Sequence, residues 1–186
     1  MLKVPFVDLA AQYRTIKDDI DSAIDSVVAE TAFIGGKYVQ NFESSFSALL
    51  GVNHVVSCAN GTDSLYIIMK VLGIGPGDEV ITVANSWISS SETITQVGAR
   101  PVFIDIDPDY YSMNEELIES KITSSTRAII AVNLQGQMCA IDRIKALCDN
   151  YKLLLIEDCA QSHLSALNGC YAGLTGIASS FSFYPG

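Results

Sequence analysis

The sequence has few basic residues, few histidines and no long apolar run. Its 186 residues include 11 Lys and Arg against 21 Asp and Glu, which gives a net charge of −10. A surface this acidic repels a phosphate backbone, so we expect no nucleic-acid partner, although one pocket can still be locally positive and bind a small anion. No apolar run approaches the ~20 residues of a bilayer crossing, so no membrane partner is expected. Two histidines are too few for a His-based metal site, so no metal is expected.

The cysteines lack the pattern of a disulfide framework. There are five, an odd number, no two of them form a C-x-x-C pair, and each lies in an apolar or small-residue stretch. These features predict buried, reduced thiols in a cytoplasmic protein. Residues 1–5 also lack the apolar core of a secretory signal peptide.

The composition favours a sizeable core over disorder, because hydrophobic residues make up 49% of the chain and charged residues only 17%. The length suits one domain of ordinary size, or the front part of a larger protein. Apolar residues recur every three or four positions over about 8–29, and a second helical pattern covers about 39–50. We therefore expect residues 1–50 to form an N-terminal helical segment.

From residue 51 onward, short apolar runs alternate with helical patterns. The runs 129–132 and 153–156 are almost entirely Ile, Val and Leu, which is typical of strands buried between two layers of helices. Strict alternation predicts an α/β fold, a three-layer, doubly wound and mostly parallel sheet. We expect 51–186 to be the N-terminal part of such a large domain. The predicted strands are 54–58, 79–84, 101–106, 128–133 and 153–157, and the predicted helices are 63–72, 89–97, 115–122 and 141–150.

Sheets of this kind bind ligands beyond the carboxyl ends of their strands, so the residues that follow each predicted strand are candidate site residues. Gly61 and Thr62 lie between a strand and a helix, where the N–H groups of Thr62 and Asp63 could bind a phosphate. Neither a Walker spacing nor G-x-G-x-x-G is present. The alternative is a capped turn without a ligand, because Asn, Thr, Asp and Ser are ordinary cap residues.

A carboxylate ends one of the most apolar predicted strands. An unpaired Asp158 would be costly there, so we expect it to meet a cation, such as a protonated pyridine nitrogen, or to cap a helix. Gln161 could return to the same pocket and donate to a phenolate oxygen, or it could be a surface amide. His163 is interpreted as structural.

An aromatic and a hydroxyl complete the candidate set. Trp87, the single tryptophan, could stack on a planar ligand or fill the core. Ser182 belongs to a predicted terminal strand in which 180, 182 and 184 share one face, and its hydroxyl could reach a phosphate near Thr62 or act as a small filler. A phosphate cradle, a stacking aromatic, a buried acid and a hydroxyl donor are together the supports that pyridoxal phosphate needs.

With these motifs in place, the chain resembles the DegT/DnrJ/StrS family of nucleotide-sugar aminotransferases, which are pyridoxal-phosphate enzymes of the aspartate-aminotransferase fold (fold type I). The resemblance covers essentially the whole chain. The motifs that carry it are, in order, VPFVDL at 4–9, FIGG at 33–36, NFE at 41–43, NGTDSL at 60–65, GIGPGDEV at 73–80, PVFIDID at 101–107, IEDCAQSH at 156–163 and FSFYPG at 181–186.

The resemblance implies a role for each candidate residue around pyridoxal 5'-phosphate. The family's Schiff-base lysine directly follows the motif that ends at Gly186, so we expect a lysine at position 187, and the small C-terminal domain is expected beyond it. The implied contacts are the phosphate for Gly61, Thr62 and Ser182, the ring face for Trp87, the pyridine nitrogen for Asp158 and the phenolic oxygen for Gln161, with Asp158 counted as catalytic.

The implied reaction is transfer of an amino group, with glutamate as the expected donor, to a keto group of a nucleotide-linked sugar for amino-sugar biosynthesis. A homodimer with its active site at the subunit interface is implied as well. One alternative is the sugar 3-dehydratase branch of the family, which requires His at 187 and tends to carry Ala where this chain has Gly186. Another is a cofactor-binding regulator without turnover.

Overall fold

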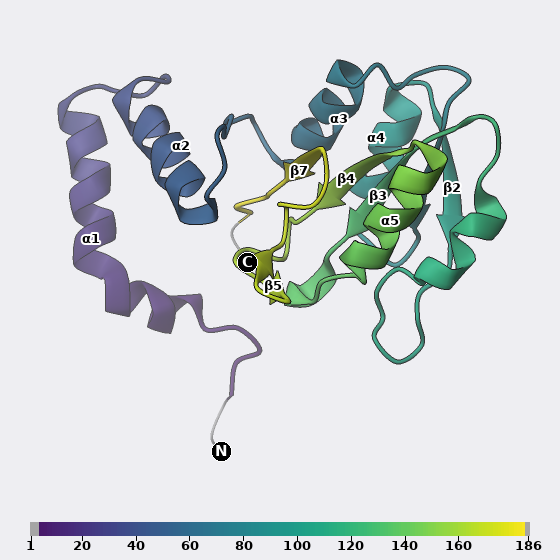
Figure 1. Cartoon of the computed structure of the whole chain (residues 1–186). Helices are drawn as coiled ribbons and strands as arrows, with labels where there is room; N and C mark the ends of the chain where they lie inside the picture. Colours follow the sequence, from purple (N-terminus) through teal and green to yellow (C-terminus); the bar gives the residue numbers. More distant parts are fainter. Residues whose placement is uncertain (1–3, 185–186) are drawn as a thin grey trace. The chain divides into compact units, whose positions relative to one another are not determined.

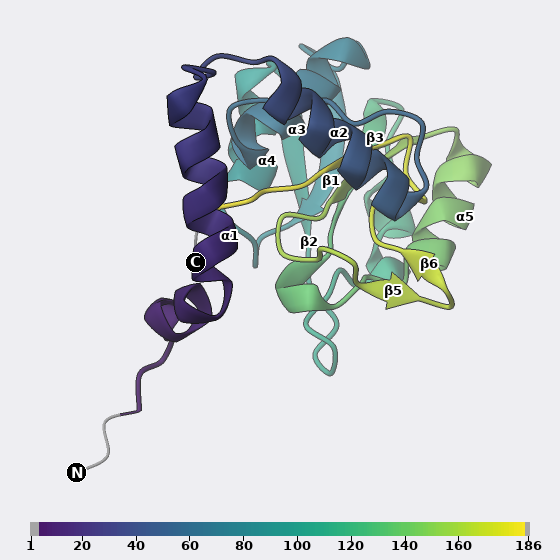
Figure 2. The same cartoon turned by 90° about the vertical axis from the view of Figure 1, so that its left-hand side faces the viewer.

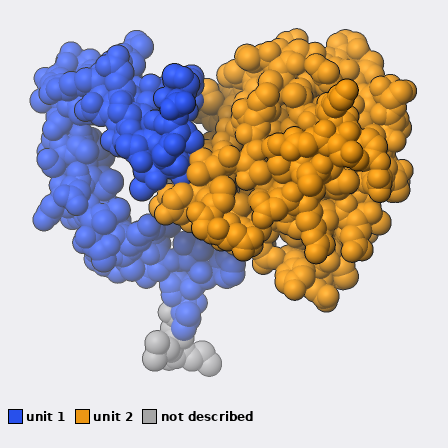
Figure 3. All heavy atoms as spheres, in the orientation of Figure 1, with its two compact units in different colours: residues 1–57, 185–186 blue, residues 58–184 orange. Residues whose placement is uncertain are grey.

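The computed structural model describes residues 4–184 and divides the chain into two compact units, one up to Ser57 and one from Cys58 to Tyr184 (Figures 1 and 3). Pro185 and Gly186 of the last motif, like residues 1–3, lie outside the described residues. Among residues 4–184, no helix is both long and apolar enough to cross a bilayer.

The first unit consists of the two helices that the periodicity predicts, α1 (Leu9–Ala29) and α2 (Lys37–Leu50). The Asp8 side chain caps α1, and α2 ends at Gly51, whose φ of 72° is left-handed, a common end for a helix. Only α2 has buried residues, and the apolar stripe of α1 is exposed. Both predicted helices are therefore confirmed.

The second unit is built on a five-stranded sheet of order β2-β1-β3-β4-β7. All four strand pairings are parallel. Every residue of β1 is buried, as expected for a strand covered on both faces. The strands are β1 (Glu79–Val83), β2 (Arg100–Ile104), β3 (Thr126–Val132), β4 (Leu154–Asp158) and β7 (Ala178–Ser180).

Helices cover both faces of this sheet (Figures 1 and 2). The helices α3 (Gly61–Val71) and α4 (Ser89–Gln96) pack together on one face, and α5 (Ile141–Tyr151) lies against β3 and β4 on the other. The predicted three-layer, doubly wound α/β fold is confirmed. Strand order reverses between β1 and β3, and ligands bind beside such a point at the carboxyl edge.

Two predicted strands differ from the structure. Residues 54–58 form no strand, because a strand needs a second strand to pair with and this segment has none among residues 4–184; Val56 is 83% exposed. The predicted terminal strand ends at Ser180, because its pairing with β4 ends where Asp158 meets Ser180. Ser182 and Tyr184 therefore lie beyond the strand, and alternation within a strand does not place them.

The predicted helix 115–122 is also different. It consists of two 3₁₀ turns, η1 (Glu115–Leu117) and η2 (Glu119–Lys121). Ile118, between them, is fully buried, and two tight turns are enough to bring this one side chain into the core. A third 3₁₀ turn, η3 (Leu134–Gly136), follows β3.

A small hairpin, β5 (Ala166–Leu167) and β6 (Cys170–Tyr171), was not among the predicted elements. Its turn residues Asn168 and Gly169 have φ values of 53° and 82°. A type I′ turn requires positive φ at both positions, and Asn-Gly is its preferred pair. The dipeptide was therefore the signal that could have predicted this hairpin.

The five cysteines are free, but they are not all buried as predicted. Cys139, Cys148 and Cys159 are buried, and burial raises the pKa of Cys139 to about 11 and that of Cys148 to about 12. Cys58 is exposed, because it lies in the segment that forms no strand.

Candidate active site

The start of α3 provides donors for an anion. Asn60 caps this helix, and its side chain accepts a hydrogen bond from the N–H of Asp63 at 2.9 Å. Asp63 is therefore already satisfied, which corrects the expectation that its N–H points at a ligand. The N–H groups of Gly61 and Thr62 have no partner within the described residues. The open donors at this helix start are thus one residue earlier than predicted.

The chain after β7 approaches this helix start closely. A Cβ on Gly61 would lie 2.9 Å from the Cβ of Ser182, closer than side chains pack, so the approach depends on glycine. The Ser180 hydroxyl donates to the Gly61 carbonyl at 3.2 Å. Gly61, Thr62 and Ser182, which were predicted to share a ligand, therefore lie together although about 120 residues separate them in sequence.

The first turn of α4 connects this region to the buried acid. Ser89 and Thr62 share a hydrogen bond between their hydroxyls at 2.6 Å. The next residue, Ser90, donates to Oδ2 of Asp158 at 2.8 Å. Two consecutive serines of one helix thus join the predicted phosphate residues to the acid predicted for the pyridine nitrogen.

Asp158 lies at the carboxyl end of β4 with 5% of its surface exposed. Besides Ser90, its carboxylate accepts a hydrogen bond from the N–H of Ala160 at 3.2 Å. Burial raises the pKa of Asp158, and the bond from Ser90 opposes that increase. A carboxylate has about four acceptor positions, and residues 4–184 supply two donors, so capacity remains for a further donor or cation.

The preceding residue, Glu157, has a different environment. It is fully buried, and it accepts hydrogen bonds from the N–H groups of Gly173, Thr175 and Gly176 at 2.8–2.9 Å. The Asn133 amide donates a fourth bond at 3.3 Å. Its four acceptor positions are therefore filled, three by the loop that leads into β7 and one by Asn133, directly after β3.

Trp87 and Gln161 border the same edge of the sheet. Trp87 lies two residues before α4 and is 78% exposed, so it does not fill the core. The side-chain oxygen of Gln161 accepts from the N–H of Gln135 at 3.0 Å, and its amide nitrogen has no partner within the described part of the chain. Both groups are therefore available to a ligand, in the form the sequence predicts: a ring face and an N–H donor.

His163 packs against aromatic rings. Its ring centroid lies 5.6 Å from that of Phe181 and 4.8 Å from that of Phe183, and burial lowers its pKa. This environment agrees with the interpretation of His163 as structural. No group of three or more His, Cys, Asp and Glu side chains in residues 4–184 is arranged to hold a metal ion.

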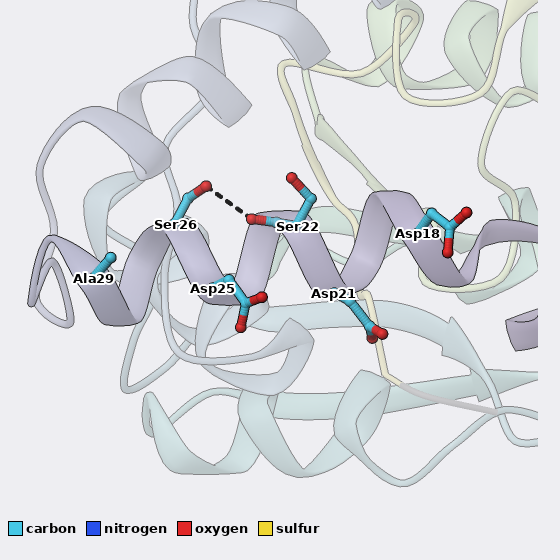
Figure 4. Close-up of a pocket in the computed structure, with 6 residues that line it drawn as sticks. All are labelled: Asp18, Asp21, Ser22, Asp25, Ser26 and Ala29. Atoms are coloured by element: carbon cyan, nitrogen blue, oxygen red, sulfur yellow. Dashed lines mark hydrogen bonds between the residues drawn. The ribbon is translucent and has the colours of Figure 1, made fainter.

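A separate hollow of about 520 Å³ lies along α1 (Figure 4). Its lining contains three carboxylates and no basic side chain, which disfavours an anionic ligand, and it includes none of the predicted site residues. It is therefore not the candidate site. The lining residues, all from one helix, are Asp18, Asp21, Ser22, Asp25, Ser26 and Ala29.

The geometry at the carboxyl edge fits pyridoxal phosphate. The close approach at Gly61 brings open backbone N–H groups and the Ser182 side chain to one place, as a phosphate requires. Asp158 offers a nearly buried carboxylate with spare acceptor capacity, as a protonated ring nitrogen requires. Trp87 presents an exposed ring and Gln161 an amide N–H group, which are the two remaining kinds of group that the cofactor requires.

The sequence interpretation missed the residues that join these groups, Ser89, Ser90 and Glu157. A signal for the serines was present, because Ser89 and Ser90 open the predicted helix 89–97 shortly after a predicted strand ends, where ligand-binding residues are expected. For Glu157 there was no such signal, because its partners are backbone N–H groups in a loop whose course the sequence does not indicate.

Residues 14–186 match the DegT/DnrJ/EryC1/StrS aminotransferase family. A curated relative named "Pleiotropic regulatory protein" from Geobacillus stearothermophilus is 38% identical over 99% of this chain and 50% of its own length. The UDP-2-acetamido-2-deoxy-3-oxo-D-glucuronate aminotransferase of Pseudomonas aeruginosa is 40% identical over 98% of this chain and 51% of its own length. The chain thus spans about half the length of the curated relatives it matches.

Solved structures also match nearly the whole of this chain. A DegT/DnrJ/EryC1/StrS aminotransferase from Brucella abortus has a TM-score of 0.95 and 39% identity, over 98% of this chain and 51% of that chain. The NtdA protein of Bacillus subtilis, solved with bound cofactor PMP, has a TM-score of 0.83 and 31% identity, over 93% of this chain and 40% of that chain. Because the family match covers nearly all of its residues, the chain belongs to the DegT/DnrJ/EryC1/StrS aminotransferase family.

Proposed function

We propose that the full-length protein binds pyridoxal phosphate at the carboxyl edge of its sheet and transfers an amino group to a keto group of a nucleotide-linked sugar. The observation that carries this proposal is the buried Asp158, which keeps free acceptor capacity and is joined through α4 to the open donors at Gly61 and Thr62. Relatives named for amino transfer to nucleotide-linked sugars support the substrate class.

The contacts and exposure of these residues support the proposed roles. Gly61, Thr62 and Ser182 bind the phosphate through backbone N–H groups and hydroxyls, and Trp87 holds the ring plane. Asp158 keeps the ring nitrogen protonated, and Gln161 donates to the phenolic oxygen. When bound, the cofactor supplies an electron-accepting ring for the group transfer.

Three further parts of the proposal concern the whole protein. We propose that residue 187 is the Schiff-base lysine, that glutamate is the amino donor, and that two copies of the chain form the active site together. We also propose a cytoplasmic location, which the five free cysteines support.

The test is reconstitution of the full-length protein with pyridoxal phosphate, followed by an assay with ¹⁵N-glutamate and a panel of UDP- and dTDP-linked keto-sugars. The expected result is ¹⁵N in the sugar product and a covalently bound cofactor, after borohydride reduction, on residue 187. Absence of label from every sugar, or a residue other than lysine at 187, would contradict the proposal. The G61A variant should retain less cofactor on dialysis, because its Cβ would occupy the space next to Ser182.

A regulator without turnover is a second candidate, favoured by the name of the Geobacillus stearothermophilus relative. Such a protein would bind the cofactor through the same residues. The ¹⁵N assay distinguishes the two candidates, since a regulator retains the cofactor on dialysis and yields no labelled sugar.

A further inference from the structure

Ser90 is a buried hydroxyl that none of the predicted ligand contacts uses. It lies in the first turn of α4 and is 1% exposed. Its Oγ donates to Oδ2 of Asp158 at 2.8 Å, across 68 positions of sequence. On the other carboxylate oxygen, the donor is the backbone N–H of Ala160, two residues along the chain. Ser90 is thus the only side chain in residues 4–184 that donates to Asp158.

The direction of these hydrogen bonds follows from proton counting. An ionised Asp158 can only accept, so the single hydroxyl proton of Ser90 is used in the bond to the carboxylate. The Ser86 hydroxyl lies 2.9 Å from the Ser90 hydroxyl, and Ser90 has no second proton to give, so Ser86 donates to Ser90. The result is a directed chain, Ser86 to Ser90 to Asp158, in which each bond polarises the next.

The same turn of α4 also orients the other end of the site. Ser89, next to Ser90, shares a hydrogen bond with Thr62 at 2.6 Å. A rigid helical turn therefore sets where the Asp158 carboxylate lies relative to the start of α3. Loss of the Ser90 bond would free one carboxylate oxygen while the Ser89 bond stays in place.

We propose that Ser90, supported by Ser86, is a positioning residue that orients the Asp158 carboxylate toward the ring nitrogen of the cofactor and stabilises its ionised form. This inference rests on the proposed function, because it assigns the ring nitrogen to Asp158. Ser90 itself touches neither cofactor nor substrate in this role. It acts on the one group that would do so.

The titratable neighbours of Asp158 do not stabilise its ionised carboxylate as Ser90 does. Glu157 precedes it on β4 and Cys159 follows directly after the strand, and the acidic Glu157 is held by the loop before β7. Burial is the largest cause that raises the pKa of Cys159, so this thiol stays neutral and adds no charge. α4 faces Asp158 with a hydroxyl, not with a cation.

The first experiment uses the full-length protein without cofactor. The Asp158 carboxyl is titrated by isotope-edited infrared spectroscopy in wild type, S90A and S91A, with D158N to assign the band. Ser91 is the matched control, because its hydroxyl donates to the Ile88 carbonyl in the same turn and does not touch Asp158. We expect S90A to raise the pKa of Asp158 by about one to two units, the range of one hydrogen bond to a charged group.

The S86A variant should raise the same pKa by a smaller amount, and S91A should leave it unchanged. If S90A does not fold, S86A gives the decisive comparison, because Ser86 is only half-buried. An Asp158 pKa that is the same in wild type, S90A and S86A would overturn the inference.

The second experiment uses the protein loaded with pyridoxal phosphate. We expect S90A to retain cofactor on dialysis, as D158N should, and to lower kcat about tenfold with little change in KM, whereas S91A behaves as wild type. Wild type that takes up no cofactor would overturn the proposed function, and the inference with it. Wild type that takes up cofactor, combined with an unchanged S90A, would overturn the positioning role alone.

Discussion

Two consecutive acids at the end of β4 have opposite kinds of environment. Glu157 accepts four hydrogen bonds, three of them from the backbone of the loop before β7, and is fully buried. Asp158 accepts two hydrogen bonds, one from the Ser90 hydroxyl and one from the backbone N–H of Ala160, and it is slightly exposed. Successive residues of a strand point to opposite faces, so two neighbouring acids can have separate surroundings.

The difference shows how a structural acid can be told from a candidate catalytic one. A carboxylate whose acceptor positions are all filled by its own fold has none left for a ligand, as for Glu157. Asp158 bears the cost of burial without that compensation, and burial raises its pKa. A cation placed beside it would supply the missing interaction. We infer that Glu157 maintains the fold of the site and that Asp158 serves the chemistry.

The largest expected effect comes from E157Q. The amide replaces one carboxylate oxygen by an N–H donor, so two hydrogen bonds are lost and donor faces donor. Each buried N–H left unpaired costs about 1–3 kcal/mol, so the free energy of unfolding should fall by about 2–6 kcal/mol. Denaturant unfolding of the full-length protein measures this change. Wild-type stability in E157Q would contradict the structural role.

D158N is the matched substitution at the neighbouring position. We expect its unfolding free energy to stay within about 1 kcal/mol of wild type, because only two hydrogen bonds are affected and the Ser90 hydroxyl can reorient. Turnover should fall by about 100-fold or more, the typical cost of losing one charge-stabilising group in a site, while cofactor is retained. Undiminished turnover, or a loss of stability as large as that of E157Q, would remove the distinction between the two acids.

The smallest expected effect concerns pH. Because the pKa of Asp158 is raised in the folded state above its ordinary value of 3.8, the folded protein binds this proton more tightly than the unfolded chain does. Its contribution to stability is therefore complete below pH 3.8 and is lost as the pH rises through the folded-state pKa. The difference in unfolding free energy between cofactor-free wild type and D158N should accordingly fall as the pH rises from 3.8. A difference that grows over this range would have the wrong sign.

Much of the fold could be predicted from the sequence because its signals are local. The apolar runs and helical periodicities give the sheet, α3, α4 and α5, since burial on both faces leaves a continuous pattern. The segment 54–58 could not be judged in this way. Its apolar residues match a strand, but a strand also needs a neighbour, and that depends on non-local pairing.

The candidate site was predictable to the extent that fold topology determines it. Ser182 follows the end of β7 as expected, and the structure brings it next to Gly61, although the strand predicted before Gly61 and Thr62 does not form. The contacts of Ser90 and Glu157 were not predictable, because both depend on partners far away in the sequence. Which acid of the Glu-Asp pair is satisfied by the fold can only be read from those contacts.

The most direct test of the central claim is a crystal structure of the full-length protein with pyridoxal phosphate or its amine form bound. We predict that the distance from the ring nitrogen to the nearer carboxylate oxygen of Asp158 lies within about 2.6–3.2 Å, with the phosphate at the N–H groups of Gly61 and Thr62. A cofactor bound elsewhere, or an Asp158 carboxylate turned away from the ring nitrogen, would contradict the account.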